Sequence, residues 1–146
     1  MQNVQVSLNK NYRHICLDLE TTWLDKDKDF IIQIGIIEID HDGKIIDHFC
    51  SYTNPGTDAS KLSETVSHLT NIKEEDLLAA PSIDQIVKHI EKYFGNDVVI
   101  VWHNISFDIW FLEKNFPSLC RSHTIDTFDI IWSNIPYLKS YALENI

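Results

Sequence analysis

The feature that most constrains the fold is a pair of isoleucine-rich segments joined by a two-residue turn. Residues 30–40 (FIIQIGIIEID) and 44–52 (KIIDHFCSY) match strands, and Asp42-Gly43 between them favours a tight hairpin. An earlier apolar run at residues 14–19 predicts a buried strand before them. We therefore expect three strands in the first third of the chain, with an antiparallel hairpin among them.

The rest of the chain is dominated by helical patterns. Asn71 is expected to cap a short helix that follows it, Pro81-Ser82 to open a helix, and Gly95 to end that helix. Helices are expected within residues 63–80 and at 82–95, 106–115, 126–134 and 140–146, with a short buried strand at 97–101. This order predicts an α/β fold with a mixed sheet flanked by helices, of which four strands are evident.

Composition limits the class of protein. A chain of 146 residues with 44% hydrophobic and 23% charged residues is one ordinary globular domain. It has no apolar run long enough for a membrane span and no apolar signal peptide, so we expect a cytoplasmic protein without a membrane partner. The three cysteines, Cys16, Cys50 and Cys120, are widely spaced and fit reduced, buried thiols.

The net charge of −10 argues against nucleic-acid binding, since phosphate binding normally shows a basic footprint. Bound divalent cations would invert the local field at a carboxylate site. A further segment or a partner that supplies positive charge is the second way to reconcile this charge with such a function.

Two acids lie near the end of the first apolar strand. If residues 14–20 form a strand, Asp18 and Glu20 point to the same face, because side chains alternate along a strand. Two carboxylates on one face offer the hard oxygen ligands that Mg²⁺ or Mn²⁺ prefers. The alternative is a solvated strand end beside a turn.

A second polar group lies in residues 99–113 (VIVWHNISFDIWFLE), where a strand runs into His103-Asn104 and a helix carries Asp108. This segment also has a structural interpretation. Asp108 would complement the dipole of the helix N-terminus, and His103 and Asn104 would cap the turn. The residues of this segment leave both interpretations open.

Together the two segments resemble a known family. DLETT after an early strand, followed some ninety residues later by HNISFD, is similar to the first two motifs of the DEDD exonucleases, most closely their DnaQ-like branch. The intervening HLTNIKEEDLLAAPS is similar too, and the resemblance covers residues 13–146, after a polar lead-in at 1–12. It implies an RNase H-like fold with a five-stranded sheet.

The resemblance implies hydrolysis of phosphodiester bonds at the 3′ ends of single-stranded DNA, in replication proofreading or repair, with two divalent cations, Mg²⁺ or Mn²⁺. Asp18 and Glu20 would hold the ion that activates water, with Asp18 bridging to the second ion, and Asp108 would complete the catalytic and metal site. Residues implied to contact the terminal nucleotide are Thr21, Thr22, Trp23, Leu24, His103, Asn104 and Phe107.

The chain departs from the family in its last third. The family's third motif has a general-base His or Tyr followed by a fourth carboxylate, whereas Glu144 is the only acid after Asp129 and no His follows His123. Asp126-Thr127 matches the family's structural Asp-Thr pair instead. We therefore expect an exonuclease domain that is incomplete at its C-terminal end and has little or no activity as it stands.

Tryptophan stands where the family has glycine. Trp23, Trp102 and Trp110 occupy such positions, with Trp132 a less certain fourth. One hypothesis is that these are UGA codons that the source organism reads as Gly; the alternative is genuine substitution. An indole at position 23 would crowd the nucleotide pocket or stack on a base. Trp102 and Trp110 would overpack a glycine-shaped core by roughly 1–3 kcal/mol each.

Other functions remain open from the sequence. An RNA-trimming exonuclease of the same fold is one, because these motifs do not reveal a 2′-hydroxyl contact. An inactive nucleic-acid-binding or protein-docking module is another, favoured by the missing third motif and the acidic charge. Expected partners are single-stranded DNA 3′ ends, with RNA as the alternative, and a DNA polymerase or a fused polymerase or helicase domain.

Overall fold

The computed structural model describes residues 8–25, 27–117, 122–134 and 140. None of the helices in these ranges is long and apolar enough to cross a membrane. The elements are β1 (Arg13–Thr21), β2 (Ile31–Ile39), β3 (Ile45–Tyr52), η1 (Gly56–Lys61), α1 (Glu64–Thr70), α2 (Glu74–Ala79), α3 (Ile83–Ile90), η2 (Glu91–Tyr93), β4 (Val98–Trp102), α4 (Ile105–Asn115), β5 (His123–Asp126) and α5 (Thr127–Asn134).

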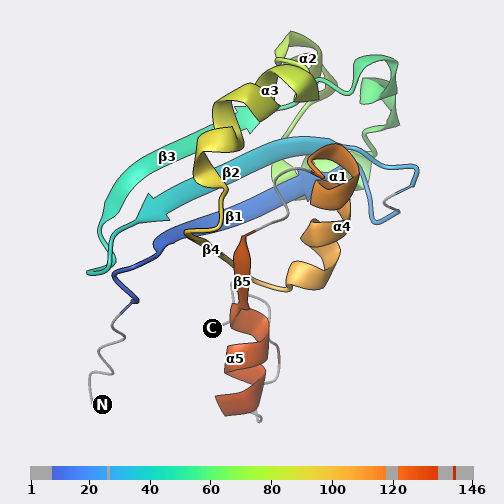
Figure 1. The fold of residues 1–146 in the computed structure, drawn as a ribbon. Coiled ribbons are helices and arrows are strands. Elements are labelled where there is room, and N and C mark those ends of the chain that lie inside the picture. Colours follow the sequence, from blue (N-terminus) through green and yellow to red (C-terminus); the bar gives the residue numbers. More distant parts are fainter. Residues whose placement is uncertain (1–7, 26, 118–121, 135–139, 141–146) are drawn as a thin grey trace.

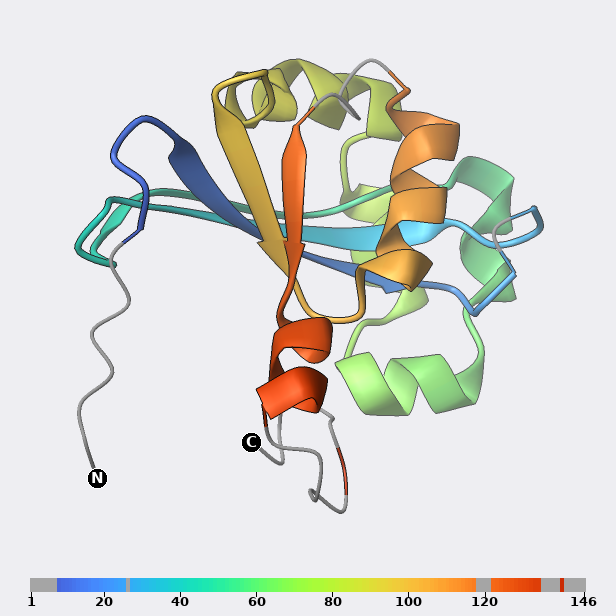
Figure 2. The ribbon, with the colours of Figure 1, turned by 60° about the horizontal axis from the view of Figure 1, so that its bottom comes forward.

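The strands form one mixed sheet with the order β3-β2-β1-β4-β5 (Figure 1). β1 lies at the centre, antiparallel to β2 and parallel to β4, and β2 and β3 form the antiparallel hairpin. β4 and β5 run parallel at the other edge, and α5 continues from the end of β5 (Figure 2). The predicted α/β class and mixed sheet are confirmed.

Alternation along β1 separates the core from the polar groups of this strand. Ile15, Leu17 and Leu19 are buried in the main core cluster, together with residues of β2, β4, α3 and α4. Because successive side chains of a strand point to opposite faces, Asp18 and Glu20 lie on the face away from this core. The predicted common face of the two acids is confirmed.

The predicted hairpin is also present. Gly43 has φ +81°, a backbone conformation that glycine adopts without a steric penalty. The backbone N–H of Gly43 bonds to the carbonyl of Asp40 at 3.0 Å, which closes the turn. The register that follows pairs Gly35 with Cys50 on one side and with Asp18 on the other.

Two predicted helix boundaries differ in the structure. Asn71 does not start α2; it ends α1 with φ +59°, a conformation that asparagine tolerates better than most residues. Gly95 does not end α3, because the helix stops at Ile90 and tightens into a single 3₁₀ turn before Phe94. The predicted helix at residues 140–146 lies almost wholly outside the described residues.

The fifth strand, β5, was missed by the sequence prediction. Its four residues, HTID, contain one apolar side chain, so they carry no strand periodicity. Pairing with β4, in which Val101 lies beside Ile125, makes the segment a strand. The helix predicted from residue 126 therefore starts one residue later, at Thr127.

Candidate active site

Asp18 and Glu20 lie near the C-terminal end of the central strand. Across β2, Asp18 is paired with Gly35 and Glu20 with Gln33, and the register shifts directly after Glu20. Asp18 also borders a hollow of about 730 Å³ on the open face of the sheet, which His48, Val101 and His103 help to line. Gly35 has no side chain, so the space beside Asp18 stays open.

Asp108 comes from α4, the helix that follows β4. Its side chain is 6% exposed, an unusual position for a carboxylate. Burial, the largest cause, and the negative charges of Asp18, Glu20 and Asp126 together raise the pKa of Asp108 to about 7. A carboxyl group with such a pKa is half protonated at neutral pH, and burial and the three neighbouring negative charges all disfavour its ionised form.

The three carboxyl groups of Asp18, Glu20 and Asp108 influence one another electrostatically. Partial desolvation raises the pKa of Asp18, although the residue still reaches solvent. Desolvation raises the pKa of Glu20 too, and the charge of Asp18 adds to this effect. Within the described ranges, none of the three forms an ion pair with Lys, Arg or His.

The three carboxylates influence one another's pKa values, but among the described residues they do not form a complete metal-binding cluster. In the part of the chain that the structure describes, no group of three or more His, Cys, Asp or Glu side chains is placed to hold a metal ion. The donor chemistry nevertheless fits a divalent cation, because hard oxygens and uncompensated negative charge are what Mg²⁺ and Mn²⁺ require. Asp18, Glu20 and Asp108 are the residues that would hold it.

Asp126 fixes the turn that precedes Asp108. Its carboxylate accepts hydrogen bonds from the backbone N–H groups of Asn104 and Ile105, both at 2.9 Å, and of Phe128 at 2.8 Å. The predicted capping by Asn104 is wrong, because its side chain makes no capping hydrogen bond. Asp126, from the neighbouring strand, caps α4 instead, which confirms a structural role for the Asp-Thr pair.

Asn104 and His103 hold the turn in other ways. Asn104 is exposed and has φ +65°, so the chain reverses sharply between β4 and α4. The Nδ1 atom of His103 lies 3.0 Å from the Thr127 hydroxyl, which donates its own proton to the Trp102 carbonyl at 2.9 Å. Thr127 therefore accepts from His103, and Nδ1 of the imidazole carries the proton.

The loop after β1 is braced by its own side chains. The Thr21 hydroxyl donates to the carbonyl of Trp23 at 2.6 Å, and the Thr22 hydroxyl donates to Asp29 at 2.9 Å. The backbone N–H of Phe30 also bonds to the Thr22 hydroxyl. Both hydroxyls are therefore engaged within the loop, whereas the side chains of Trp23 and Leu24 are 49% and 64% exposed.

Phe107, the last of the predicted nucleotide contacts, lies half-buried on the first turn of α4. Its ring packs against Phe111 with a centroid distance of 5.2 Å, and the contact joins it to the edge of the main core. Phe107 and Asp108 are neighbours in sequence, but the carboxylate is the more deeply buried of the two.

The tryptophans differ in their surroundings. Trp102 is 4% exposed in the core, and its indole Nε1–H has no hydrogen-bond partner among the described residues. Trp23 and Trp110 are 49% and 48% exposed, so the predicted overpacking at Trp110 is wrong: this face of α4 points outward. Positive φ among the described non-glycine residues is confined to Asn71 and Asn104, so the backbone does not require glycine at any of the three.

Comparison with known proteins places this fold in a family. The sequence profile of the RNase_T exonuclease family matches residues 15–146. The chain belongs to this family, which makes it a DnaQ-like exonuclease domain by descent. The mixed five-stranded sheet is the one that the resemblance implied.

Among individual relatives, the "DNA polymerase III PolC-type" protein of Staphylococcus aureus is 33% identical over 125 residues, 83% of this chain. The chain spans only 8% of the length of that relative, and the same holds for the protein of strain MW2.

Solved structures support the fold. E. coli exonuclease I, crystallised with a 5cy-dA13 oligonucleotide, superimposes with a TM-score of 0.76 at 17% identity, over 92% of this chain and 35% of that one. An apo structure of exonuclease I gives a TM-score of 0.78. This likeness confirms the predicted RNase H-like fold.

Proposed function

We propose that this chain carries the site of a metal-dependent 3′–5′ exonuclease that hydrolyses the terminal phosphodiester bonds of single-stranded DNA. The observation that carries the proposal is Asp108, a nearly buried carboxyl whose pKa is raised to about 7 by burial and by Asp18, Glu20 and Asp126. Such repulsion destabilises the fold unless a cation offsets it, and functional sites are where such perturbed groups gather.

The residues of the site would have two different roles, metal binding and positioning of α4. Asp18 and Glu20, on one face of β1, and Asp108, on α4, would hold the divalent cations, and Asp126 would keep α4 in position for this. When bound, these ions would polarise the scissile phosphate and lower the pKa of water. Family membership supports the nuclease activity, and the polymerase relative is consistent with a role in replication, with a DNA polymerase as partner.

The direct test is an assay with single-stranded DNA that carries fluorescein at its 5′ end, incubated with high concentrations of the protein and Mn²⁺. The proposal expects slow shortening from the 3′ end, because the chain has no counterpart of the family's third motif. The Asp18→Asn variant should leave the DNA intact, whereas Glu113→Gln, an exposed change on α4, should not. Equal shortening by the Asp18→Asn variant would refute the proposal.

A further inference from the structure

Two lysines from distant parts of the chain converge on one aromatic ring. The Nζ atoms of Lys61, at the end of η1, and of Lys114, near the end of α4, lie 4.9 Å and 5.6 Å from the centroid of the Phe30 ring. Because like charges repel, two ammonium groups beside one ring disfavour each other electrostatically. Lys61 is already paired with the Asp58 carboxylate at 2.6 Å, and a phosphate bound beside the ring would offset the charge of both ammonium groups.

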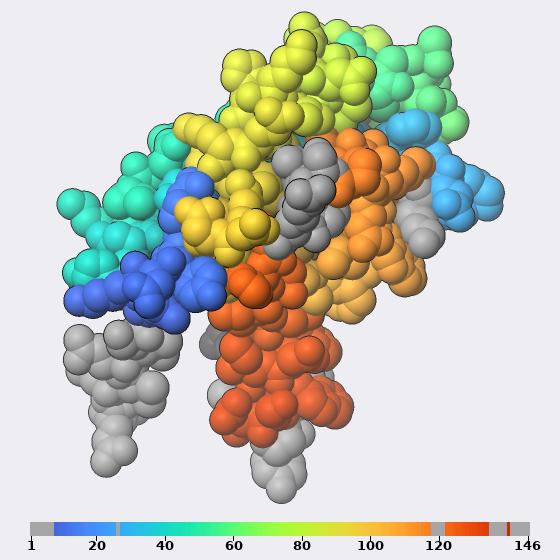
Figure 3. Space-filling view, in the orientation of Figure 1, coloured from blue at the N-terminus to red at the C-terminus, as the bar shows by residue number. Residues whose placement is uncertain are grey.

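This group lies close to the carboxylate site. Phe30 is joined to Thr22, two residues after Glu20, by two hydrogen bonds of 2.9 Å and 3.1 Å. Lys114 is six residues beyond Asp108 on α4, which is about 9 Å along the helix axis. Figure 3 shows the residues of this loop (light blue) beside α4 (orange) on one face of the molecule.

An exposed aromatic side chain borders the lysines. Trp110 precedes Lys114 by four residues on α4, so the two side chains are neighbours on the helix surface. The indole is 48% exposed. Trp110, Phe30, Lys61 and Lys114 therefore form one surface, which we call the Phe30 patch, in which cations and aromatic rings alternate.

We infer that the Phe30 patch binds the phosphates and bases of a single strand upstream of its 3′ end. The inference rests on the proposed function and deepens it, since it supplies a local basic footprint in a chain of net charge −10. A cationic groove with aromatic platforms is the chemistry by which proteins hold single strands without reading sequence. The separation of about 9 Å along the helix axis between Asp108 and Lys114 corresponds to roughly three stacked nucleotides.

The acids near the patch do not prevent this. Lys61 forms an ion pair with Asp58 at 2.6 Å, and the Lys61 side chain stays 52% exposed. Exposed pairs of this kind contribute little, so exchanging Asp58 for a phosphate has a small cost. Asp29, on the same loop as Phe30, directs its carboxylate to Thr22 and to the backbone of Asp25.

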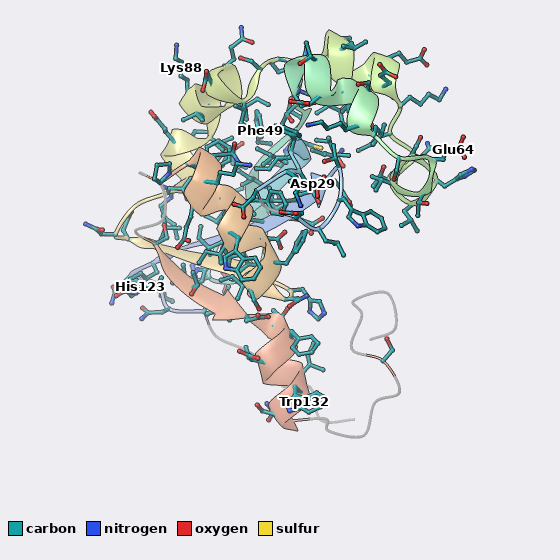
Figure 4. All side chains as sticks on the ribbon, turned by 90° about the vertical axis from the view of Figure 1, so that its right-hand side faces the viewer. Asp29, Phe49, Glu64, Lys88, His123 and Trp132 are labelled. Atoms are coloured by element: carbon teal, nitrogen blue, oxygen red, sulfur yellow. The ribbon has the colours of Figure 1, made fainter. Side chains whose placement is uncertain are left out.

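The test is fluorescence anisotropy with a short fluorescein-labelled oligothymidylate in EDTA, which prevents hydrolysis and isolates the patch from the metal site. Lys61→Gln and Lys114→Gln should each weaken binding roughly threefold or more and lower the salt slope by about 0.7. The control is Lys88→Gln on α3, because Figure 4 shows Lys88 well apart from Asp29. This control should bind as the original chain does.

A second arm distinguishes a nucleic-acid strand from any polyanion. Trp110→Ala should weaken binding of the oligothymidylate but not of inorganic polyphosphate, which has no base to stack. Equal affinity and salt slope in the Lys61, Lys114 and Lys88 variants would overturn the inference, as would no binding by the original chain. If the two lysine variants bind as the original chain does and still shorten DNA with Mn²⁺ at low salt, the Phe30 patch inference fails while the proposed function stands.

Discussion

The Asp126 carboxylate accepts a hydrogen bond from the backbone N–H of Asn104 at 2.9 Å, so the last residue of β5 holds the first turn of α4. The two residues are 22 positions apart in the sequence. Because Asp108 lies in this first turn of α4, the position of the buried carboxylate depends on a strand that sequence periodicity did not reveal.

Removal of this cap should destabilise the fold. We expect Asp126→Ala to lower the free energy of unfolding by about 2–3 kcal/mol, since three backbone N–H groups lose a charged acceptor. Asp126→Asn, which keeps one acceptor oxygen, should lose less. Urea denaturation followed by circular dichroism measures both, and equal stability of the three proteins would contradict the assigned role.

Asp108 should make the metal-free protein less stable as the pH rises. Its folded pKa of about 7 lies above the ordinary value of 3.8, so the folded state binds the extra proton between these two pH values. Stability therefore falls as the pH rises through this window. At pH 8 in EDTA, Asp108→Asn should be more stable than the original chain by on the order of 3 kcal/mol, and at pH 4 the difference should nearly vanish.

Denaturant titrations at several pH values measure this difference. Glu113→Gln removes one negative charge from the same helix at an exposed position and serves as the matched control. A constant stability difference between the Asp108→Asn variant and the original chain from pH 4 to pH 8 would show that Asp108 ionises as an ordinary carboxylate.

His14 should make the protein less stable as the pH falls, the opposite of the effect of Asp108. It is 3% exposed, its Nδ1 has no hydrogen-bond partner among the residues described, and burial lowers its pKa below 6.5. The unfolded state therefore binds more protons below about pH 6.5, and stability is lost as the pH falls through that range. His14→Leu should remove this loss, which the same titrations would detect as a smaller drop between pH 7 and pH 5.

Much of this fold follows from local patterns. The isoleucine-rich hairpin around Gly43 and the alternation of Leu17, Asp18 and Leu19 on β1 are short-range signals, and the structure agrees with both. The same alternation predicts that Asp18 and Glu20 share a face. These features need no knowledge of the rest of the chain.

The features that the sequence did not predict depend on contacts between residues that are far apart in the chain. β5 has little periodicity of its own and becomes a strand through pairing with β4. The cap on α4 is Asp126, although Asn104 is the nearer and more usual capping residue. The burial of Asp108 and the exposure of Trp110 follow from how α4 packs on the sheet, which its weakly amphipathic sequence does not determine.

Substitutions at Trp102 distinguish genuine tryptophan from the hypothesis of recoded glycine. Its burial predicts that Trp102→Gly leaves a cavity and lowers the free energy of unfolding by about 3–5 kcal/mol. Trp102→Phe keeps an apolar ring and removes the unpaired indole N–H, so it should be neutral or stabilising by about 1 kcal/mol. A higher melting temperature for Trp102→Gly would favour a glycine-shaped site, and the codons at positions 23, 102 and 110 test the recoding hypothesis independently.

The central claim is that Asp18, Glu20 and Asp108 together bind divalent cations. Electron paramagnetic resonance of free Mn²⁺, titrated against the protein at pH 8, measures this binding without any need for catalysis. We predict that the original chain and Glu113→Gln take up Mn²⁺ alike, and that Asp18→Asn and Asp108→Asn each weaken uptake at least tenfold. Equal Mn²⁺ uptake by all four proteins, or none by the original chain, would contradict the account.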